Sequence, residues 1–421
     1  MLVGIKLCSF TIKKDYLQSS AVLFLSILPI FFFIGTGLLN VGIIILNFIF
    51  LAEIITKKRL FFLRNYIFYS LILLWLTLLI NIAFSIDPFN SFGRGFGFLR
   101  FIFFVMALIY FFNLHNQKFK NLILCCWSII FLIVSIDLLF EFSTGKNLLG
   151  FESYINGRLA SFFNDELIIG HFYYGFVLIT IVYFLQKFSK KNGQFNLKNY
   201  IYFFIFTFLI ISFLIGERSN FIKILIMVFL FSFLFEKKFF KLKILLFSVF
   251  FLLIVLFVNF NSNFKDRFAT QIFKPILNNP VQYFNNLNYI QHYRTAIKVY
   301  ENNKIFGVGL KNYRLEVGNK VYHNLHTSTH PHQIHFEFLS ELGVMGYLFI
   351  IIFFIYHFYK FGKNKLHNDN LNLAGLLFVL TSLLPLLPSG SFFTSNGATL
   401  FWLNFAMMTL NQKKNNYDFF R

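Results

Sequence analysis

The sequence predicts an all-α polytopic membrane protein with about twelve transmembrane helices and one large periplasmic loop. Of its 421 residues, 57% are hydrophobic and 13% are charged, whereas soluble domains carry roughly 25% charged residues. The mean hydropathy is +0.67. Several apolar stretches, such as 242–260, are long enough to cross a hydrocarbon layer of ~30 Å. This composition excludes an ordinary soluble domain.

The apolar runs define the expected spans and the segments between them. They fall at 21–36, 39–55, 66–84, 96–113, 121–142, 168–186, 200–215, 219–235, 242–260, 342–359, 372–388 and 394–410. We treat residues 1–421 as a single integral membrane domain. Within it, the polar, Asn-rich segment 261–341 is expected to be a large periplasmic loop that carries part of the functional site. An amphipathic helix is expected at about 287–302.

The distribution of basic residues predicts the topology. When the N-terminus is placed inside, 23 of the 38 Lys and Arg residues fall at the termini or in the inside segments. Inside segments of membrane proteins carry an excess of Lys and Arg, so both termini are expected in the cytoplasm. The formal net charge of +21 is therefore explained by topology, and no nucleic-acid partner is expected.

Charged residues gather where the expected spans meet the outer side. Burying a charge in the hydrocarbon costs about 2.5–3.5 kcal/mol on insertion scales, so such residues are informative. They are Arg94, Arg100, Asp137, Glu141, Arg158, Glu217, Arg218 and Lys223. A structural interpretation is that they reach water or pair with one another, for instance Arg100 with Asp137. As a set on one side, they predict a polar cavity open to the outside.

Five of the ten histidines lie directly before the tenth expected span. They are His323, His326, His330, His332 and His335. Their spacing is compatible with a metal site, because neutral imidazole is a common ligand. It is also compatible with a general base, because a group with a pKa near 6.5 accepts a proton from a hydroxyl at neutral pH. A solvated polar loop without chemistry is the third interpretation, and the residues alone leave all three open.

Several motifs, in order along 85–410, resemble the O-antigen ligase and O-antigen polymerase family. His332-Gln333, followed after nine residues by Gly343-x-x-Gly346, resembles its His-Asn/Ser/Gln signature with a spaced Gly-x-x-Gly. RTAIKVYENNKIFGVGLKNYR, GERSNFIKILI, RLASFFNDELIIG and SIDPFNSFGR resemble further family segments. Departures also occur. Glu217 and Ser219 flank the arginine where Ser and Gly are usual, Ser161 replaces a glycine, and 166–167 replaces Pro-Asn.

The resemblance implies a glycosyltransferase of the bacterial inner membrane that uses an undecaprenyl-diphosphate-linked saccharide at the periplasmic face. It implies a catalytic set of His332 as the base and Arg218 and Arg294 at the departing diphosphate. Arginine binds phosphate oxygens through two parallel hydrogen bonds, and the diphosphate leaves without a proton, so no metal or cofactor is expected. Further candidates for substrate binding are Arg158, Arg94, Arg100, Tyr313 and His330. Single displacement implies inversion at the anomeric carbon.

Three functions fit these observations. A ligase transfers a finished chain to lipid A–core, whereas a polymerase transfers a growing chain to a lipid-linked saccharide. The His-Gln-x9-Gly-x-x-Gly spacing favours the ligase. A twelve-helix transporter is the alternative from another class. It is disfavoured because such proteins commonly show repeat symmetry and midplane polar sites, and this sequence shows no internal repeat.

Overall fold

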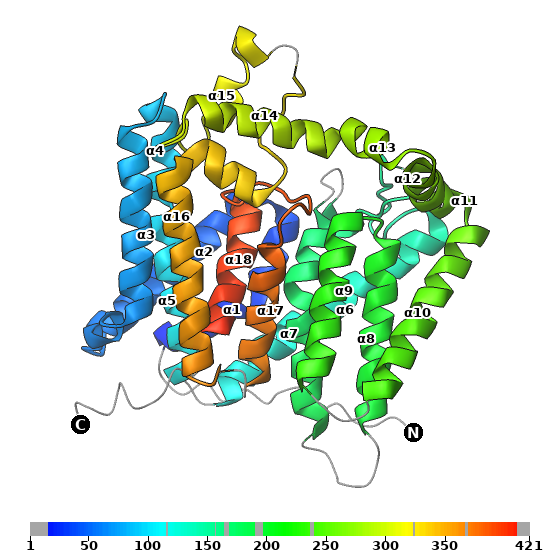
Figure 1. The fold of residues 1–421 in the computed structure, drawn as a ribbon. Helices are drawn as coiled ribbons and strands as arrows, with labels where there is room; N and C mark the ends of the chain where they lie inside the picture. Colours follow the sequence, from blue (N-terminus) through cyan, green and yellow to red (C-terminus); the bar gives the residue numbers. More distant parts are fainter. Residues whose placement is uncertain are drawn as a thin grey trace.

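All regular secondary structure in the part of the chain that the structure describes is helical (Figure 1). The computed structural model describes residues 16–114, 117–155, 157–163, 168–189, 197–235, 240–322, 325–366 and 369–410. His323 and residues 166–167, which are named above, therefore lie outside the described part.

The elements follow one another as long helices joined by short ones. The first half contains α1 (Tyr16–Ile34), α2 (Thr36–Thr56), η1 (Leu60–Leu63), α3 (Tyr66–Ala83), α4 (Pro88–Gly97), α5 (Leu99–Leu114), α6 (Gln117–Thr144), η2 (Ser161–Phe163), α7 (Ile169–Ser189) and α8 (Leu197–Leu214). The second half contains α9 (Arg218–Phe235), α10 (Phe240–Phe260), α11 (Ser262–Phe264), the π-helix η3 (Lys265–Phe273), α12 (Lys274–Asn278), α13 (Pro280–Asn286), α14 (Asn288–Asn302), α15 (Tyr313–Glu316), η4 (Lys320–Tyr322), α16 (Ile334–Lys363), α17 (Asn370–Ser382) and α18 (Ser395–Met408).

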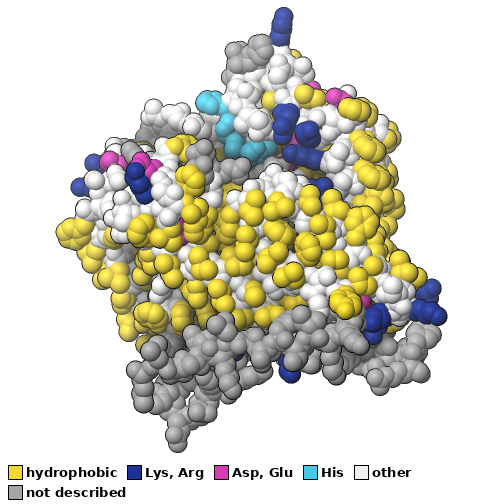
Figure 2. Space-filling model, turned by 180° about the vertical axis from the view of Figure 1, so that it is seen from behind, with side chains coloured by type: hydrophobic (Ala, Val, Ile, Leu, Met, Phe, Trp, Pro, Cys, Tyr) yellow, Lys and Arg dark blue, Asp and Glu magenta, His cyan; other side chains and the backbone are white. Residues whose placement is uncertain are grey.

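The long helices form a bundle around α18. This helix packs against α17, α5, α2 and α7, and its Trp402 is fully buried. On the face shown in Figure 2, apolar side chains form a broad band, and charged side chains lie above and below it. Within the described residues, nine helices are long and apolar enough to cross a membrane. This confirms an all-helical membrane protein and leaves the predicted count of twelve unconfirmed.

The difference from twelve has a local cause at α17. The predicted span 372–388 is helical only to Ser382, because Pro385 and Pro388 lack the N–H that a helix interior requires. At 1.5 Å per residue, the 13 residues of α17 cover only about 20 Å. The 14-residue α18 is also shorter than a full span.

We call one end of the bundle the loop face. It carries residues 84–98, 145–155, 157–163, 215–217, 261–322, 325–333 and 383–394, and α14 runs across it (Figure 1). The expected amphipathic helix at 287–302 corresponds to α14. Part of this region has a small core of its own, made of Ala296, Val299, Val308, Tyr313, Val317 and Tyr322. The long polar segment is therefore a packed structure that covers the helix ends.

A break in α16 joins this region to the bundle. Gly343 has φ 66° and ψ −173° inside the helix. A Cβ at Gly343 would lie 2.3 Å from the carbonyl oxygen of Ile305 and 2.5 Å from the nitrogen of Gly307. Only glycine tolerates both this φ and this approach of two backbones. The span predicted to start at 342 thus begins at a kink, and helix Ile334–Leu342 precedes it.

The opposite end of the bundle has a smaller polar network. The buried Glu53 accepts hydrogen bonds from Gln18 at 2.9 Å and from the Tyr110 hydroxyl at 3.4 Å. Arg59 donates to the Tyr110 oxygen at 3.1 Å. Glu53 therefore ties α1, α2 and α5 together.

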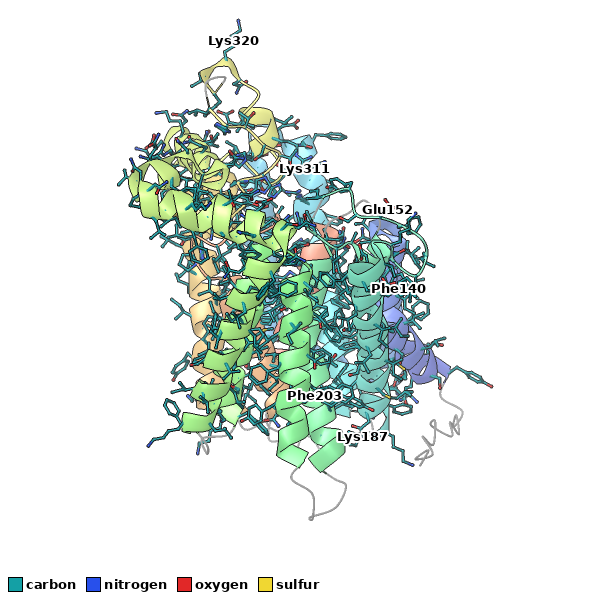
Figure 3. All side chains as sticks on the ribbon, turned by 90° about the vertical axis from the view of Figure 1, so that its right-hand side faces the viewer. Phe140, Glu152, Lys187, Phe203, Lys311 and Lys320 are labelled. Atoms are coloured by element: carbon teal, nitrogen blue, oxygen red, sulfur yellow. The ribbon has the colours of Figure 1, made fainter. Side chains whose placement is uncertain are left out.

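The predicted topology can be tested with single cysteines. Lys320 lies at the tip of the loop face and Lys187 at the opposite end (Figure 3). In a background with Cys8, Cys125 and Cys126 replaced by serine, we expect Lys320→Cys to react with a membrane-impermeant maleimide in intact spheroplasts. Lys187→Cys should react only after the membrane is dissolved. If only Lys187→Cys were labelled in intact spheroplasts, the protein would have the opposite topology.

Candidate active site

A carboxylate at the turn between α8 and α9 organises the first part of the site. Glu217 accepts hydrogen bonds from Asn220 at 2.6 Å and from the Gly170 backbone at 3.3 Å. Its Oε1 lies 3.0 Å from Nη2 of Arg158. Burial raises the pKa of Glu217, and the charge of Arg158 and these hydrogen bonds oppose that rise. Glu217 thus pairs with Arg158.

The loop that carries Arg158 is held by two carboxylates of α6. Asp137 accepts from the Ser161 hydroxyl at 2.6 Å and from the Leu148 backbone at 2.8 Å. Glu141 accepts from the backbone N–H groups of Ala160 at 2.9 Å and Ser161 at 2.7 Å. Asp137 therefore does not pair with Arg100, which instead donates to the Gly97 carbonyl at 3.1 Å. The two acidic residues at the end of α6 act as anchors for the loop.

The local backbone explains a departure from the family pattern. Ser161 stands where the pattern has glycine, and it has φ 50°, a conformation that glycine adopts most readily. The hydrogen bonds to Asp137 and Glu141 hold the serine there. Beside it, the loop packs so closely on the α8–α9 turn that a Cβ at Gly216 would lie 2.2 Å from the Gly157 carbonyl oxygen.

Arg218 and Arg267 join Arg158 at this turn, and we call the three the arginine cluster. Arg218 begins α9, donates to Gln271 at 2.6 Å and lies over the Phe268 ring at 5.7 Å. Arg267 comes from η3 and donates to the Gly216 carbonyl at 2.8 Å. Burial and the charges of Arg218 and Arg158 lower the pKa of Arg267 to about 10, so it stays protonated at neutral pH. The cluster concentrates positive charge on the loop face.

Three histidines form a second group, which we call the histidine cluster. The His332 ring centroid lies 4.1 Å from that of His330 and 5.0 Å from that of His292. His292 comes from α14, whereas the other two precede α16. In Figure 2, histidine side chains gather beside Lys and Arg in a recess of the loop face. Among the residues described, no group of three His, Cys, Asp or Glu side chains has the spacing to hold a metal ion.

The environment favours neutral imidazoles in this cluster. Burial and the nearby His292 lower the pKa of His332. Burial, His332 and the charges of Arg94 and Arg314 lower the pKa of His330 to about 4. Within the described part of the chain, the ring nitrogens of His332 have no hydrogen-bond partner. A neutral imidazole with an available lone pair is the form that accepts a proton.

Tyr289 lies between the two clusters. Its ring centroid is 5.9 Å from that of His332, and its hydroxyl is within electrostatic range of Arg218. Tyr289 belongs to the first turn of α14, so this helix borders both clusters. Of the predicted residues, Arg158 and Arg218 thus lie in one cluster on the loop face, and His330 and His332 lie in the other.

The other predicted residues have different surroundings, although the charge of Arg94 still acts on His330. Arg294 is exposed on α14 and donates to Asn285 at 2.7 Å. Arg94 lies 3.6 Å from the buried Glu341, and Arg100 stacks on Phe101 at 4.6 Å. Tyr313 is fully buried in the small core of the loop region. Its ring packs in that core, so the structure does not place Tyr313 in either cluster.

Sequence reasoning missed Arg267, His292 and Arg314. Each lies in the long polar segment 261–341, where charged residues are ordinary and carry little information. His292 stands one helical turn before Ala296, which faces the small core. Its position on the expected amphipathic helix was the only feature of the sequence that could have identified it. For Arg267, the sequence offered no such feature beyond the charge of the side chain.

The fold and the site define a polytopic, all-helical membrane protein with a polar site on one face of its bundle. Residues 203–351 match the family model described as O-antigen ligase. This segment carries Arg218, Arg267, Arg294 and the histidine cluster, and the match confirms the family resemblance for the motifs that lie within it. No curated protein sequence matches the chain.

The role of Glu141 as an anchor can be tested by proteolysis. Glu141→Ala removes the acceptor of two backbone N–H groups, and each unsatisfied buried group costs about 1–3 kcal/mol. We therefore expect trypsin to cleave after Arg158 at least about tenfold faster than in the unchanged protein. Glu152→Ala, which removes an exposed carboxylate of the same loop, should leave the rate unchanged. Equal rates for the Glu141 variant and the unchanged protein would show that the carboxylate does not hold the loop.

Proposed function

We propose that this protein is an O-antigen ligase-like glycosyltransferase. It would move a polysaccharide from undecaprenyl diphosphate to a sugar hydroxyl of lipid A–core at the periplasmic face. The observation that carries the proposal is the placement of the arginine cluster and His332 on one face, with Tyr289 between them. The ligase description of the matching family model supports the choice of reaction.

In this proposal, the arginine cluster binds the diphosphate of the donor. Negative charge gathers on the diphosphate as the bond to the anomeric carbon breaks, and cations already in place stabilise that charge without rearrangement. Arg158 and Arg218 each have a buried Nε–H group that has no hydrogen-bond partner within the described residues. These donors, together with the charge of Arg267, suit phosphate oxygens.

His332 is proposed to act on the acceptor. The neutral imidazole takes the proton of the sugar hydroxyl while the hydroxyl oxygen bonds to the anomeric carbon. The bond from that carbon to the diphosphate oxygen breaks in the same step, and the diphosphate leaves as an anion. The sugar is inverted at the anomeric carbon, and neither a metal nor a cofactor takes part. His330, Arg94 and Arg100 remain proposed substrate contacts, and Arg294 a proposed diphosphate ligand.

A reconstituted assay tests the reaction. Purified protein in proteoliposomes, with EDTA present, would receive a defined undecaprenyl-diphosphate saccharide and either lipid A–core or a second lipid-linked saccharide. We expect transfer to lipid A–core. His332→Ala and Arg218→Ala should each lower the rate by about 10²-fold or more, because a general base alone contributes ~10²–10⁴-fold. Lys320→Ala, at the distant tip, is the control and should retain full activity.

The outcomes of this assay are distinct. Transfer only to the lipid-linked saccharide would make the protein a polymerase with the same donor chemistry. Unchanged activity in His332→Ala would remove this residue as the base. Absence of transfer to either acceptor by correctly folded protein would overturn the proposal.

The pH dependence of transfer provides a separate check on the base. A lowered pKa keeps His332 neutral throughout the range above its ordinary value of 6.5. We therefore expect kcat/KM to be constant between pH 7 and 8 and to fall only as the pH drops below about 6.5, where the imidazole becomes protonated. The residual activity of His332→Ala should lack this fall. A midpoint above pH 7 would contradict the lowered pKa.

A further inference from the structure

The segment between α17 and α18 contacts both halves of the proposed site. We call Leu383–Phe393 the strap. It lies beyond the residues that match the family model, and none of the residues predicted for the site belongs to it. Its backbone groups nevertheless bond to α9, which begins with Arg218, and to the residues around His332. This double contact requires an explanation.

Two side chains of α9 hold the strap at Pro388. The Ser219 hydroxyl donates to the Pro388 carbonyl oxygen, and the Lys223 ammonium donates to the same oxygen at 3.2 Å. Lys223 is only 3% exposed, and no carboxylate pairs with it among the described residues. A buried cation without a counter-charge is costly, so packing alone does not account for a lysine here.

The start of α16 holds the strap from the other side. The Ser389 N–H donates to the His332 carbonyl oxygen at 2.8 Å. Glu337, which is 1% exposed, accepts from the Ser391 hydroxyl and from the Phe392 N–H at 2.8 Å. The His335 ring bonds to the Leu383 carbonyl oxygen at 2.8 Å. Tyr293 of α14 also donates to the Leu386 carbonyl oxygen at 3.3 Å.

One peptide group makes both central contacts. The Pro388 carbonyl and the Ser389 N–H belong to the same planar unit, and no cis peptide bond occurs in the described chain. In a trans peptide, the C=O and the N–H point in opposite directions and cannot rotate independently. The Pro388–Ser389 peptide therefore fixes the separation between α9 and His332. His332 also has φ 59°, an unfavourable conformation for a histidine, which needs such a contact to persist.

We propose that the Pro388–Ser389 peptide, held by Ser219 and Lys223, positions the His332 imidazole relative to the diphosphate bound at Arg218. This inference rests on the proposed function. Ser219 and Lys223 are then positioning residues that act through the strap and do not touch the substrate. The proposed donor site is at Arg218. The side chain of Arg218 is held by Gln271 and Phe268, which do not belong to the strap. Loss of the strap contacts should therefore affect the chemical step and spare donor binding.

The test compares Ser219→Ala/Lys223→Met with the unchanged protein in the reconstituted assay. Rates are expressed per donor-binding site, counted with a radiolabelled lipid-linked donor, so that loss of folded protein does not lower them. We expect kcat to fall about 10–100-fold, because a misplacement of about 1 Å can cost 10²-fold. The donor KM should change less than about threefold. Ser219→Thr/Lys223→Arg, which retains both donors, should restore most of kcat.

A matched control is available at the other end of the bundle. Lys243 is also buried and donates to a carbonyl oxygen, that of Ser232, at 2.7 Å. Lys243→Met should leave kcat per site unchanged. An unchanged kcat in the double variant, or an equal loss in Lys243→Met, would overturn the positioning role. A donor KM that rises as much as kcat falls would also overturn it. None of these results affects transfer by the unchanged protein, on which the proposed function depends.

Discussion

Mutual repulsion among Arg158, Arg218 and Arg267 is the constraint on which the site depends. Each guanidinium lies at the border of an apolar bundle, where like charges interact more strongly than in water. The repulsion is visible in Arg267, whose pKa is lowered by burial and by both neighbouring arginines. Glu217 opposes that effect and pairs with Arg158 at 3.0 Å. A single carboxylate therefore allows three cations to gather and still leaves the cluster positive.

Several other charged groups on the loop face stabilise the structure instead of contacting a substrate. Asp137 and Glu141 bind the backbone and the hydroxyl of the Arg158 loop. Glu337 and Lys223 bind the strap from opposite sides. Irregular backbone near hydrocarbon has few water molecules to satisfy its N–H and C=O groups. Buried charged side chains supply those hydrogen bonds, and they keep two irregular segments fixed beside the clusters.

The sequence predicted the bundle well because apolar runs and basic segments report directly on the membrane. It also placed Arg158, Arg218 and His332 on one face, since each adjoins the end of an apolar run. It failed where tertiary contacts decide the outcome. Tyr313 follows a Gly-x-Gly turn and was a candidate for substrate binding, yet its ring fills the small core beside Tyr322. Arg267 lies within a long polar segment, where nothing local shows that η3 folds back onto Gly216.

The division between the matched segment and the rest of the chain has a physical meaning. Residues 203–351 carry the side chains proposed to contact the donor and acceptor, apart from Arg158, Arg94 and Arg100. The strap, which binds Lys223 and Glu337 of this segment, lies outside it, as do Asp137 and Glu141, which hold the Arg158 loop. A positively charged phosphate site and a neutral base lose their relation if the backbone between them moves. The Pro388–Ser389 peptide prevents that movement because its two hydrogen-bonding groups are fixed in one plane, so the geometry of the site depends on residues that do no chemistry.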